Sequence, residues 1–380
     1  MVNYRIAKPE DMDGIIDFIN MVFSMLRVPH NFETMLPKVY GKDFRLADIH
    51  VIAEDEKGRL SGCLGMYEFP LRVGDTTLRV GYLGSMAVHP RVRGQGTMGM
   101  LMQKQIERGF ERGLDLMVLG GQRQRYQYSG FETGGTTYLY SISRSNVRHA
   151  LAGAQEEGLS FAPMTQEDVP AALALYDRQA VAGARREDNF IATLVSYHRQ
   201  AWAAKKDGVL VGYLSAEEDG SHLEEIVMAQ ESMILPAIKA WMSEKDVRLL
   251  HVAVAPHDTA LNSLLAPICE DCSMTPNCMI RVLKPETVLP AYMKLKRSCD
   301  PLEKGALVLE WEGLGTYRLC VTDEGVAAEK TDCSPDIRLS GIEMHRMLFS
   351  PNRFGLPQAA KAAPRSWFPL PLHIPEPDSF

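Results

Sequence analysis

The chain has 380 residues, 46% of them hydrophobic and 23% charged, which is enough for two or three domains with hydrophobic cores of their own. A formal net charge of −7 argues against broad nucleic-acid binding and leaves room for a cationic substrate. No apolar run reaches the roughly 18 residues of a membrane span, and the first residues lack the apolar stretch of a secretion signal. Seven cysteines without framework spacing indicate reduced thiols and a cytoplasmic location.

The N-terminal segments predict a short strand, a helix and then a set of strands. Residues 4–6 are predicted to form the first strand, and an acidic helix start follows at Pro9. Apolar stretches with turn residues between them predict strands at 51–54 and 62–69 and a further hairpin at 71–83. The sequence therefore predicts a mixed α/β unit at this end of the chain.

A basic, glycine-rich loop comes after the strand that ends at Met86–Val88. Pro90 ends the strand, and helical spacing of apolar residues predicts a helix from Thr97 to Phe110. The free N–H groups at a helix start, its dipole and nearby arginines together favour phosphate or pyrophosphate binding. The loop itself contains Arg91, Arg93, Gly94, Gln95 and Gly96.

The loop matches neither of the two common phosphate-binding motifs. It lacks the Gly-Lys-Ser/Thr of a Walker loop, and it lacks the third glycine and the later acidic residue of the dinucleotide fingerprint. The alternative interpretation is a basic surface turn. The pattern Arg-x-x-Gly-x-Gly after such a strand resembles motif A of the GCN5-related N-acetyltransferases (GNAT superfamily), in which this loop cradles the pyrophosphate of acetyl-coenzyme A.

The resemblance implies a set of coenzyme-binding residues. Backbone groups of the strand end would pair with the pantetheine arm, and the loop and helix start would hold the pyrophosphate. His89 is interpreted as structural rather than as a base. The predicted acetyl-CoA-binding residues are Met86, Val88, Arg91, Arg93, Gly94, Gln95, Gly96, Thr97 and Met98.

A second motif lies in the segment after the predicted strand at 115–119. Tyr126, Gly130 and Phe131 resemble the Tyr and Gly-Phe pair that come after this strand in the GNAT superfamily. The resemblance implies that Tyr126 is the general acid that protonates the leaving thiolate. Two alternatives stay open: Tyr128 takes this role, or Tyr126 packs over the coenzyme and donates no proton.

The segment 160–281 echoes the first unit without its loop. Residues 161–169 repeat the strand and acidic helix start of residues 4–12, and residues 202–214 form a similar hairpin. At the place equivalent to the basic loop stands Met228–Ser232, with neither glycine nor arginine. The sequence therefore predicts a unit that keeps the fold and has lost coenzyme binding.

The whole architecture resembles the Eis (enhanced intracellular survival) family. The predicted domains are a catalytic GNAT domain at 1–145, a GNAT-like domain at 146–283 and a sterol-carrier-protein-like domain at 284–380, giving an overall α/β (α+β) fold of two mixed-sheet units and an α/β unit. Members of that family acetylate amines, aminoglycosides among them, and assemble as hexamers built from trimers. The resemblance implies a homo-oligomer for this chain.

In the Eis family the chain's own terminal carboxylate reaches the N-terminal active site. The resemblance makes the carboxylate of Phe380 the candidate base, with Asp378 adding negative charge at the substrate mouth. The alternative is an ordinary docked tail. No metal is predicted, because Cys269, Cys272 and Cys278 lack a fourth ligand in register.

The sequence thus predicts an acetyl-CoA-dependent N-acetyltransferase acting on a small amine, with no nucleic-acid or membrane partner. Two alternatives stay open. One is a ligand-binding protein that uses the sterol-carrier-like domain, and the other is a protein or peptide N-acetyltransferase. Aminoglycoside acetylation rests on the family resemblance alone.

Overall fold

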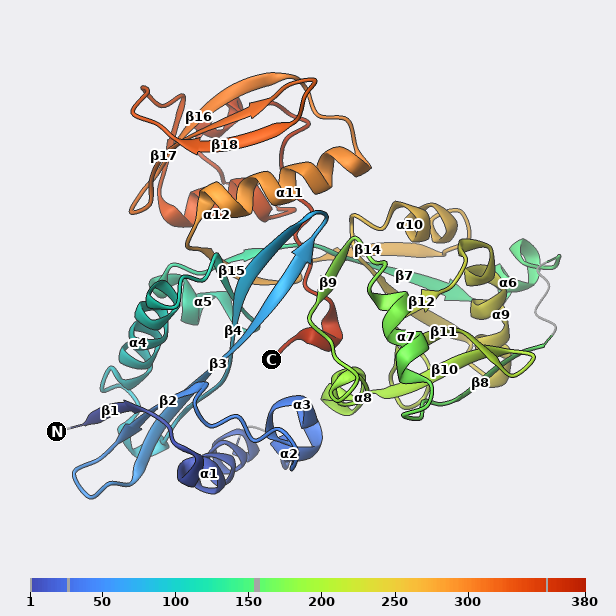
Figure 1. The fold of residues 1–380 in the computed structure, drawn as a ribbon, viewed down its shortest axis with the longest axis horizontal. Helices are drawn as coiled ribbons and strands as arrows, with labels where there is room; N and C mark the ends of the chain where they lie inside the picture. Colours follow the sequence, from blue (N-terminus) through green and yellow to red (C-terminus); the bar gives the residue numbers. More distant parts are fainter. Residues whose placement is uncertain (1, 26–27, 154–157, 353–354) are drawn as a thin grey trace.

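The computed structural model describes residues 2–25, 28–153, 158–352 and 355–380. It contains an eight-stranded, a seven-stranded and a four-stranded sheet with helices packed on them, which confirms the predicted mixed α/β class. In Figure 1 the first sheet crosses the middle of the molecule, the second lies to its right and the third lies above both.

The first sheet has the order β1-β2-β3-β4-β5-β15-β6, and β9 pairs with the far end of β3. Its pairs are antiparallel except for β4 and β5, which run parallel. The strands are β1 (Asn3–Ile6), β2 (His50–Glu54), β3 (Leu60–Val73), β4 (Thr76–Val88), β5 (Leu116–Leu119), β6 (Glu132–Gly134), β9 (Val181–Gly183) and β15 (Cys278–Val282).

Helices cover both faces of this sheet because its strands are apolar on both sides. Ile52 and Cys63 face the cluster that contains α1 (Met12–Ser24), α2 (Phe32–Met35) and α3 (Pro37–Tyr40). Their neighbours Val51 and Leu64 face α4 (Thr97–Glu111), as the twofold alternation of a strand requires. The predicted helix from Thr97 to Phe110 is confirmed and is one residue longer.

The second sheet has the order β14-β7-β13-β12-β11-β10-β8 and repeats the succession of the first. Only β12 and β13 are parallel, at the position that β4 and β5 hold in the first sheet. The strands are β7 (Thr137–Ser143), β8 (Leu159–Pro163), β10 (Gln200–Lys206), β11 (Val209–Ala216), β12 (His222–Met228), β13 (Leu249–Val254) and β14 (Asp271–Thr275). The helices of this part are α6 (Arg144–Ala150), α7 (Val169–Tyr176), α8 (Phe190–Leu194), α9 (Ile234–Glu244) and α10 (Thr259–Leu265).

The chain crosses between the first two sheets more than once. It leaves the first sheet at β6 and enters the second at β7, it adds β9 to the first sheet between β8 and β10 of the second, and it returns from β14 to β15. The sheets therefore do not follow the predicted boundaries at 145/146 and 283/284, since β7 precedes the first boundary and β15 precedes the second. A local apolar pattern indicates that a segment forms a strand, but it does not indicate with which strand that segment pairs.

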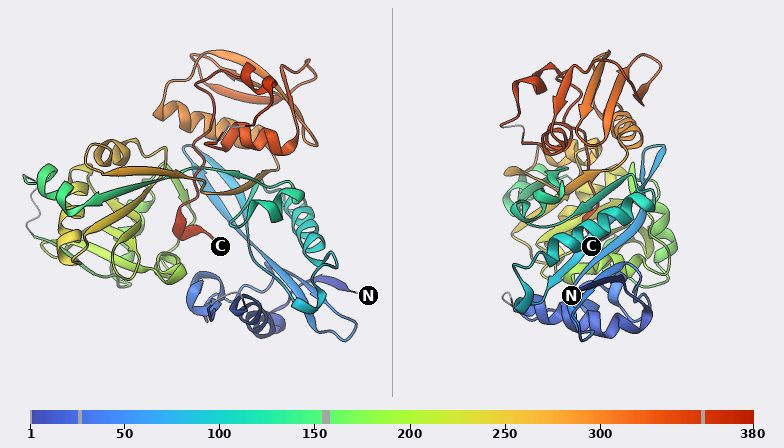
Figure 2. Two further views of the ribbon diagram at one scale, coloured as in Figure 1. Left: turned by 180° about the vertical axis from the view of Figure 1, so that it is seen from behind. Right: turned by 90° about the vertical axis from the view of Figure 1, so that its left-hand side faces the viewer.

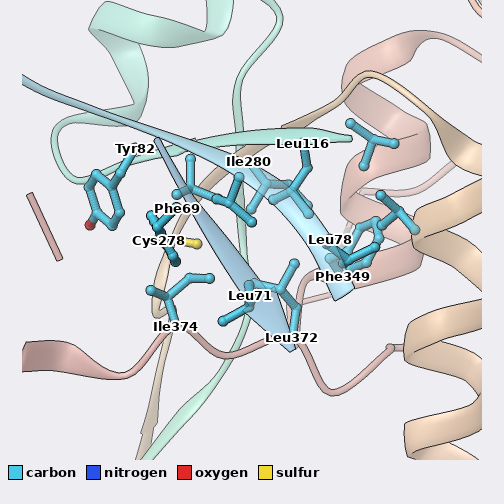
Figure 3. Packing of buried hydrophobic residues seen from close by; sticks show 14 of the residues in the cluster. Phe69, Leu71, Leu78, Tyr82, Leu116, Cys278, Ile280, Phe349, Leu372 and Ile374 are labelled. Atoms are coloured by element: carbon cyan, nitrogen blue, oxygen red, sulfur yellow. The ribbon is translucent and has the colours of Figure 1, made fainter. Parts of the chain in front are cut away.

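The third sheet packs on two helices and shares a core with the first. Its order is β18-β17-β16-β19, formed by β16 (Gly305–Trp311), β17 (Gly315–Val321), β18 (Val326–Lys330) and β19 (Ile337–Leu339), and the helices are α11 (Pro285–Cys299) and α12 (Gly341–Phe349). Figure 3 shows the junction, where Leu71 of β3, Ile280 of β15, Phe349 of α12 and Leu372 of the C-terminal segment belong to one cluster.

The C-terminal segment 367–380 returns to the first sheet without forming an α-helix, as its prolines predict. It is held by backbone hydrogen bonds: Leu370 N–H donates to Leu348 O (2.7 Å), and Thr136 N–H donates to Leu372 O (3.0 Å). In both views of Figure 2 the C-terminus lies in the middle of the molecule. Within the described ranges, each helix is too short or too polar to cross a membrane.

Candidate active site

The parallel strands β4 and β5 separate before β4 ends. They pair only from Val80 to Leu83, whereas β4 continues to Val88. On its other side β4 bulges against β3, since the register shifts between the pairs Gly65–Gly84 and Cys63–Ala87. Ser85 within the bulge has a φ of 55°. The bulge turns the end of β4 away from β5 and opens the sheet at this point.

A cavity of about 1140 Å³ occupies this opening. Its wall includes the end of β4, the basic loop, the start of α4, the end of β5, α5 (Arg123–Tyr126), the first two helices and the C-terminal residues. A cavity of this size is in the range of sites that bind cofactors and other sizeable ligands. Segments far apart in the sequence therefore meet at one concave site.

The basic loop presents the start of α4 to the cavity. A 3₁₀ turn, Pro90–Val92, is capped by His89, whose Nδ1 accepts a hydrogen bond from Arg91 N–H (3.2 Å), so His89 is structural as predicted. Gly94 and Gly96 have φ values of 78° and 81°, a region that side chains with a Cβ resist. An added Cβ would meet open space at both positions, so crowding does not explain the two glycines. The positive φ of the backbone is therefore the reason for glycine here.

Most residues of the predicted coenzyme-binding set lie at the cavity. Arg93 belongs to its wall and directs its Nε toward Val88 O, at 3.4 Å. Arg91 and Gln95 are exposed and fall outside the lining. The predicted residues that line the cavity are Met86, Val88, Arg93, Gly94, Gly96, Thr97 and Met98.

Tyr126 lies at the cavity and Tyr128 does not. Tyr126 ends the short helix α5 and is half-buried, with its ring against Gly121, where an added Cβ would lie 2.7 Å from a ring carbon. Burial raises the pKa of the Tyr126 hydroxyl, so it is protonated at neutral pH. Tyr128 is 87% exposed, which removes it as an alternative at this site.

A buried ion network fixes the segment that carries Tyr126. Glu132 accepts hydrogen bonds from Arg123 at the start of α5 (2.5 and 2.7 Å) and from Arg346 of α12 (2.7 Å). Burial opposes its ionisation, yet the hydrogen bonds from Arg123 and Arg346 lower the pKa of Glu132 to about 2. This network, which ties the C-terminal part to the site, has no motif that sequence reasoning could use.

The terminal residue reaches the bulge of β4. Phe380 is 6% exposed, and its ring contacts those of Tyr40 and Tyr67 at centroid distances of 6.2 and 6.3 Å. A Cβ at Gly84 would lie 2.8 Å from a terminal oxygen of Phe380, and one at Gly65 would lie 2.7 Å from its ring. Both positions need glycine so that the terminal residue can lie flat on the bulge.

The residues before Phe380 are held by charges. Asp378 is 8% exposed and pairs with Arg185 (2.9 Å), which also pairs with Glu225 (2.7 Å). The expectation that Asp378 adds negative charge at the substrate mouth is therefore wrong, because Asp378 lies in the interior, outside the cavity lining, where it shares Arg185 with Glu225. Lys38 Nζ donates to Pro377 O (2.6 Å), and burial lowers the pKa of Lys38 to about 7.

Glu376 is a site residue that the sequence did not reveal. Its carboxylate lines the cavity, accepts a hydrogen bond from Asn277 Nδ2 (3.4 Å) and lies 4.0 Å from Arg199. Burial, and then the charge of Glu224, raise the pKa of Glu376 to about 7. A glutamate in a proline-rich tail matches no motif, and its nearness to the chain end was the one available signal.

Two of the three cysteines with metal-like spacing, Cys272 and Cys278, lie on different sheets. Cys272 lies on β14 of the second sheet, whereas Cys278 lies buried on β15 of the first. In the described part of the chain, the ligand atoms of Glu217, His222 and Glu224 lie within 4.8 Å of one another, and Arg199 already pairs with Glu224 at 3.0 Å.

The open strand pair, the glycine loop at a helix start and the half-buried Tyr126 lie together in the N-terminal part of the chain, and comparison with known proteins shows which domain this part forms. Residues 3–134 match the family model described as an acetyltransferase (GNAT) domain. The protein is therefore an enzyme with a GNAT N-acetyltransferase domain, a class that takes its acyl group from an acyl-coenzyme A. A comparison with curated protein sequences finds no significant match.

Several solved structures share the fold over the whole length of the chain. A GCN5-related N-acetyltransferase from Anabaena variabilis has a TM-score of 0.71 and 16% identity, with 100% of each chain covered. Eis1 from Mycobacterium abscessus has a TM-score of 0.68 and 15% identity, again with 100% of each chain covered. A GCN5-related N-acetyltransferase from Kribbella flavida has a TM-score of 0.68 and 16% identity over 91% of this chain and 88% of that one.

Proposed function

We propose that the protein is an acetyl-CoA-dependent N-acetyltransferase that acetylates a primary amine of a small, cationic acceptor. The observation that carries the proposal is the cavity at the opening of β4 and β5. One wall presents the helix start at Gly96, another presents Tyr126, and the carboxylate of Phe380 lies on the bulge. In this proposal the anion cradle holds the acyl-coenzyme A, the carboxylate takes the amine proton and the tyrosine protonates the leaving thiolate.

The coenzyme would lie along the end of β4. Its pyrophosphate meets the unpaired N–H groups at the start of α4, with Arg93 beside them. The free backbone edge of Met86–Val88, turned away from β5 by the bulge, pairs with the pantetheine amides. This arrangement brings the thioester to the opening between the strands.

Acetyl transfer then needs two proton movements. The neutral amine nitrogen attacks the thioester carbonyl carbon, so that a C–N bond forms and the C–S bond breaks. The carboxylate of Phe380 accepts the proton that the amine loses, directly or through water, and the Tyr126 hydroxyl donates a proton to the departing sulfur. Return of the proton from the carboxylate to Tyr126 through solvent restores both groups, and the products are an amide and coenzyme A.

The architecture extends the proposal to the whole chain. We infer that the second sheet is a GNAT-like unit without coenzyme binding, because its strand order repeats that of the first sheet while its loop lacks the glycines. The similarity to Eis1 supports an Eis-type enzyme with a sterol-carrier-like third unit. An oligomer and a cytoplasmic location stay predictions from the sequence.

Coenzyme A release from acetyl-CoA, measured against a panel of primary amines, tests the proposal. Calorimetry of acetyl-CoA binding is run in parallel on the same protein. Binding together with turnover of at least one amine is the expected result. Absence of acetyl-CoA binding would overturn the coenzyme site at Gly96, and hence the proposed function.

A further inference from the structure

The first two helices line the same cavity with apolar and aromatic side chains. Phe23 and Met35 are partly exposed, and Phe32 and Leu36 are buried behind them. Phe23 comes from the end of α1, Phe32 and Met35 come from α2, and Leu36 directly follows α2. Both helices lie beside the lower end of the first sheet in Figure 1. We call this part of the lining, formed by Phe23, Phe32, Met35 and Leu36, the aromatic wall.

The aromatic wall is continuous with the terminal residue. The rings of Phe23 and Phe32 meet at 5.0 Å, those of Phe32 and Tyr40 at 5.6 Å, and those of Tyr40 and Phe380 at 6.2 Å. The first two pairs are edge-to-face, the geometry that aromatic pairs prefer. The rings therefore form an ordered surface that leads to the terminal carboxylate.

Two polar side chains next to this wall, Tyr40 and His30, have hydrogen-bond partners within the protein. The Tyr40 hydroxyl donates to Ser85 Oγ (2.7 Å) and contacts His50 Nε2 (2.9 Å). His30 Nδ1 lies 2.9 Å from Val28 O. The four side chains of the aromatic wall offer no hydrogen-bonding group, so a hydroxyl placed on them would lose water without gaining a partner, whereas an apolar group would gain contact area.

Negative charge lies at the inner end of the wall. The carboxylate of Phe380 rests on Gly84, and Glu376 lines the same cavity. An ammonium group is favoured beside carboxylates and over aromatic faces. The cavity thus offers one charged end and one apolar wall to the acceptor.

We propose that the acceptor is an amphipathic primary amine, in which a short chain joins the amino group to an aromatic or bulky apolar group. The amine lies at the Phe380 carboxylate, and the apolar group packs on the aromatic wall. This inference rests on the proposed function, because it names the substrate class of the same site. It predicts a preference against polyhydroxylated amines, aminoglycosides among them.

The first experiment compares acceptors that differ in the group beyond the amine. Values of kcat/KM are measured on the full chain for 2-phenylethylamine, butylamine, ethanolamine, spermidine and an aminoglycoside. We expect 2-phenylethylamine to exceed ethanolamine by at least about tenfold, since a hydrophobic pocket discriminates to this extent for small apolar changes. An equal or higher kcat/KM for ethanolamine or the aminoglycoside would overturn the inference.

The second experiment alters the wall itself. Phe23→Ala is compared with Met21→Ala, a substitution at an exposed position of the same helix. Phe23→Ala should lower kcat/KM for 2-phenylethylamine about tenfold more than it lowers kcat/KM for ethanolamine, whereas Met21→Ala changes neither. A proportional loss for both amines in Phe23→Ala would overturn the role of the wall. Acetyl-CoA binding without turnover of any amine would count against the proposed function instead.

Discussion

The parallel strand pairs of the first two sheets share a geometry and differ in the size of the cavity beside them. In the first sheet β4 and β5 pair over four positions and then open onto a cavity of about 1140 Å³. In the second sheet β12 and β13 pair only at His222–His251 and Leu223–Val252 and open onto a cavity of about 220 Å³. The opening itself is thus a property of the shared topology.

The loop after the strand makes the difference. After β4 the chain reaches α4 through Gly94 and Gly96, both at positive φ, so that backbone N–H groups face an open cradle. After β12 it passes Gln230 in extended conformation and a 3₁₀ turn, Glu231–Met233. Tail residues, His373 among them, then line the smaller cavity. The fold therefore supplies the opening, and the glycines and charges of one loop turn it into a candidate coenzyme site.

The largest expected effect comes from removing the proposed general acid, the Tyr126 hydroxyl, from the opening between β4 and β5. Tyr126→Phe deletes the hydroxyl and keeps the ring against Gly121. We expect kcat to fall by about 10²–10⁴-fold, the range for loss of general acid catalysis, with acetyl-CoA affinity unchanged. Tyr128→Phe, at a position that is 87% exposed, serves as the matched control and should keep full activity. A Tyr126→Phe enzyme with normal turnover would rule out the acid role.

The terminal carboxylate gives the next effect. One glycine added after Phe380 moves the carboxylate by about 3.5 Å, which exceeds the tolerance of a positioned base. We expect kcat to fall by about 10²-fold while the thermal midpoint changes little, because the clamp between Asp378 and Arg185 stays intact. Circular dichroism melts and steady-state rates, measured on the same preparation, separate a loss of stability from a loss of activity. Full activity of the extended chain would exclude the base role of Phe380.

Substitutions in the loops after β4 and β12 should give a smaller effect, on the affinity for acetyl-CoA. Gly96→Ala places a Cβ at a φ of 81°, which costs about 1–2 kcal/mol. The bound loop must hold this conformation, so we expect the Kd of acetyl-CoA in calorimetry to rise by about tenfold. Ala229→Gly in the second sheet should leave both Kd and a stoichiometry of one unchanged. A second binding event in that variant, or an unchanged Kd for Gly96→Ala, would contradict the contrast between the loops.

The sequence predicted the parts of the site that are local in the chain. The loop at Gly94–Gly96 and the pair at Gly130–Phe131 are short patterns with fixed spacing, and Tyr126 lies at the cavity where the resemblance placed it. Contacts between distant segments left no such pattern: the ion pair between Asp378 of the C-terminal segment and Arg185, in the loop after β9, joins residues that are 193 positions apart. The exchange of β7 and β15 between the sheets was missed for the same reason, since pairing partners are not written in a strand's own residues.

The smallest effect concerns Glu376. This carboxyl group lines the cavity at the first sheet and belongs to no sequence motif. Burial and the charge of Glu224 raise the pKa of Glu376 to about 7, so it is neutral below pH 7 and ionised above. Other groups that face it are Lys38, Tyr197 and Arg199, with Tyr82 and Cys278 nearby. A cationic acceptor should therefore bind more tightly as the pH rises from 6 to 8.

Glu376→Gln tests this through binding and stability at once. We expect KM for the amine at pH 8 to rise about fivefold in the variant, which corresponds to ~1 kcal/mol for a partly exposed charge pair. At pH 6 the ratio of the KM of the variant to that of the wild type should approach one.

The same substitution should stabilise the folded protein at high pH, although it weakens binding of the acceptor. Because the folded pKa of Glu376 lies above its unfolded value, the wild type loses stability as the pH rises through about 7, and the glutamine variant does not. The variant should thus unfold at a higher temperature than the wild type at pH 8, and the difference should shrink at pH 5. Equal KM ratios at pH 6 and pH 8 would show that the carboxylate of Glu376 does not bind the acceptor.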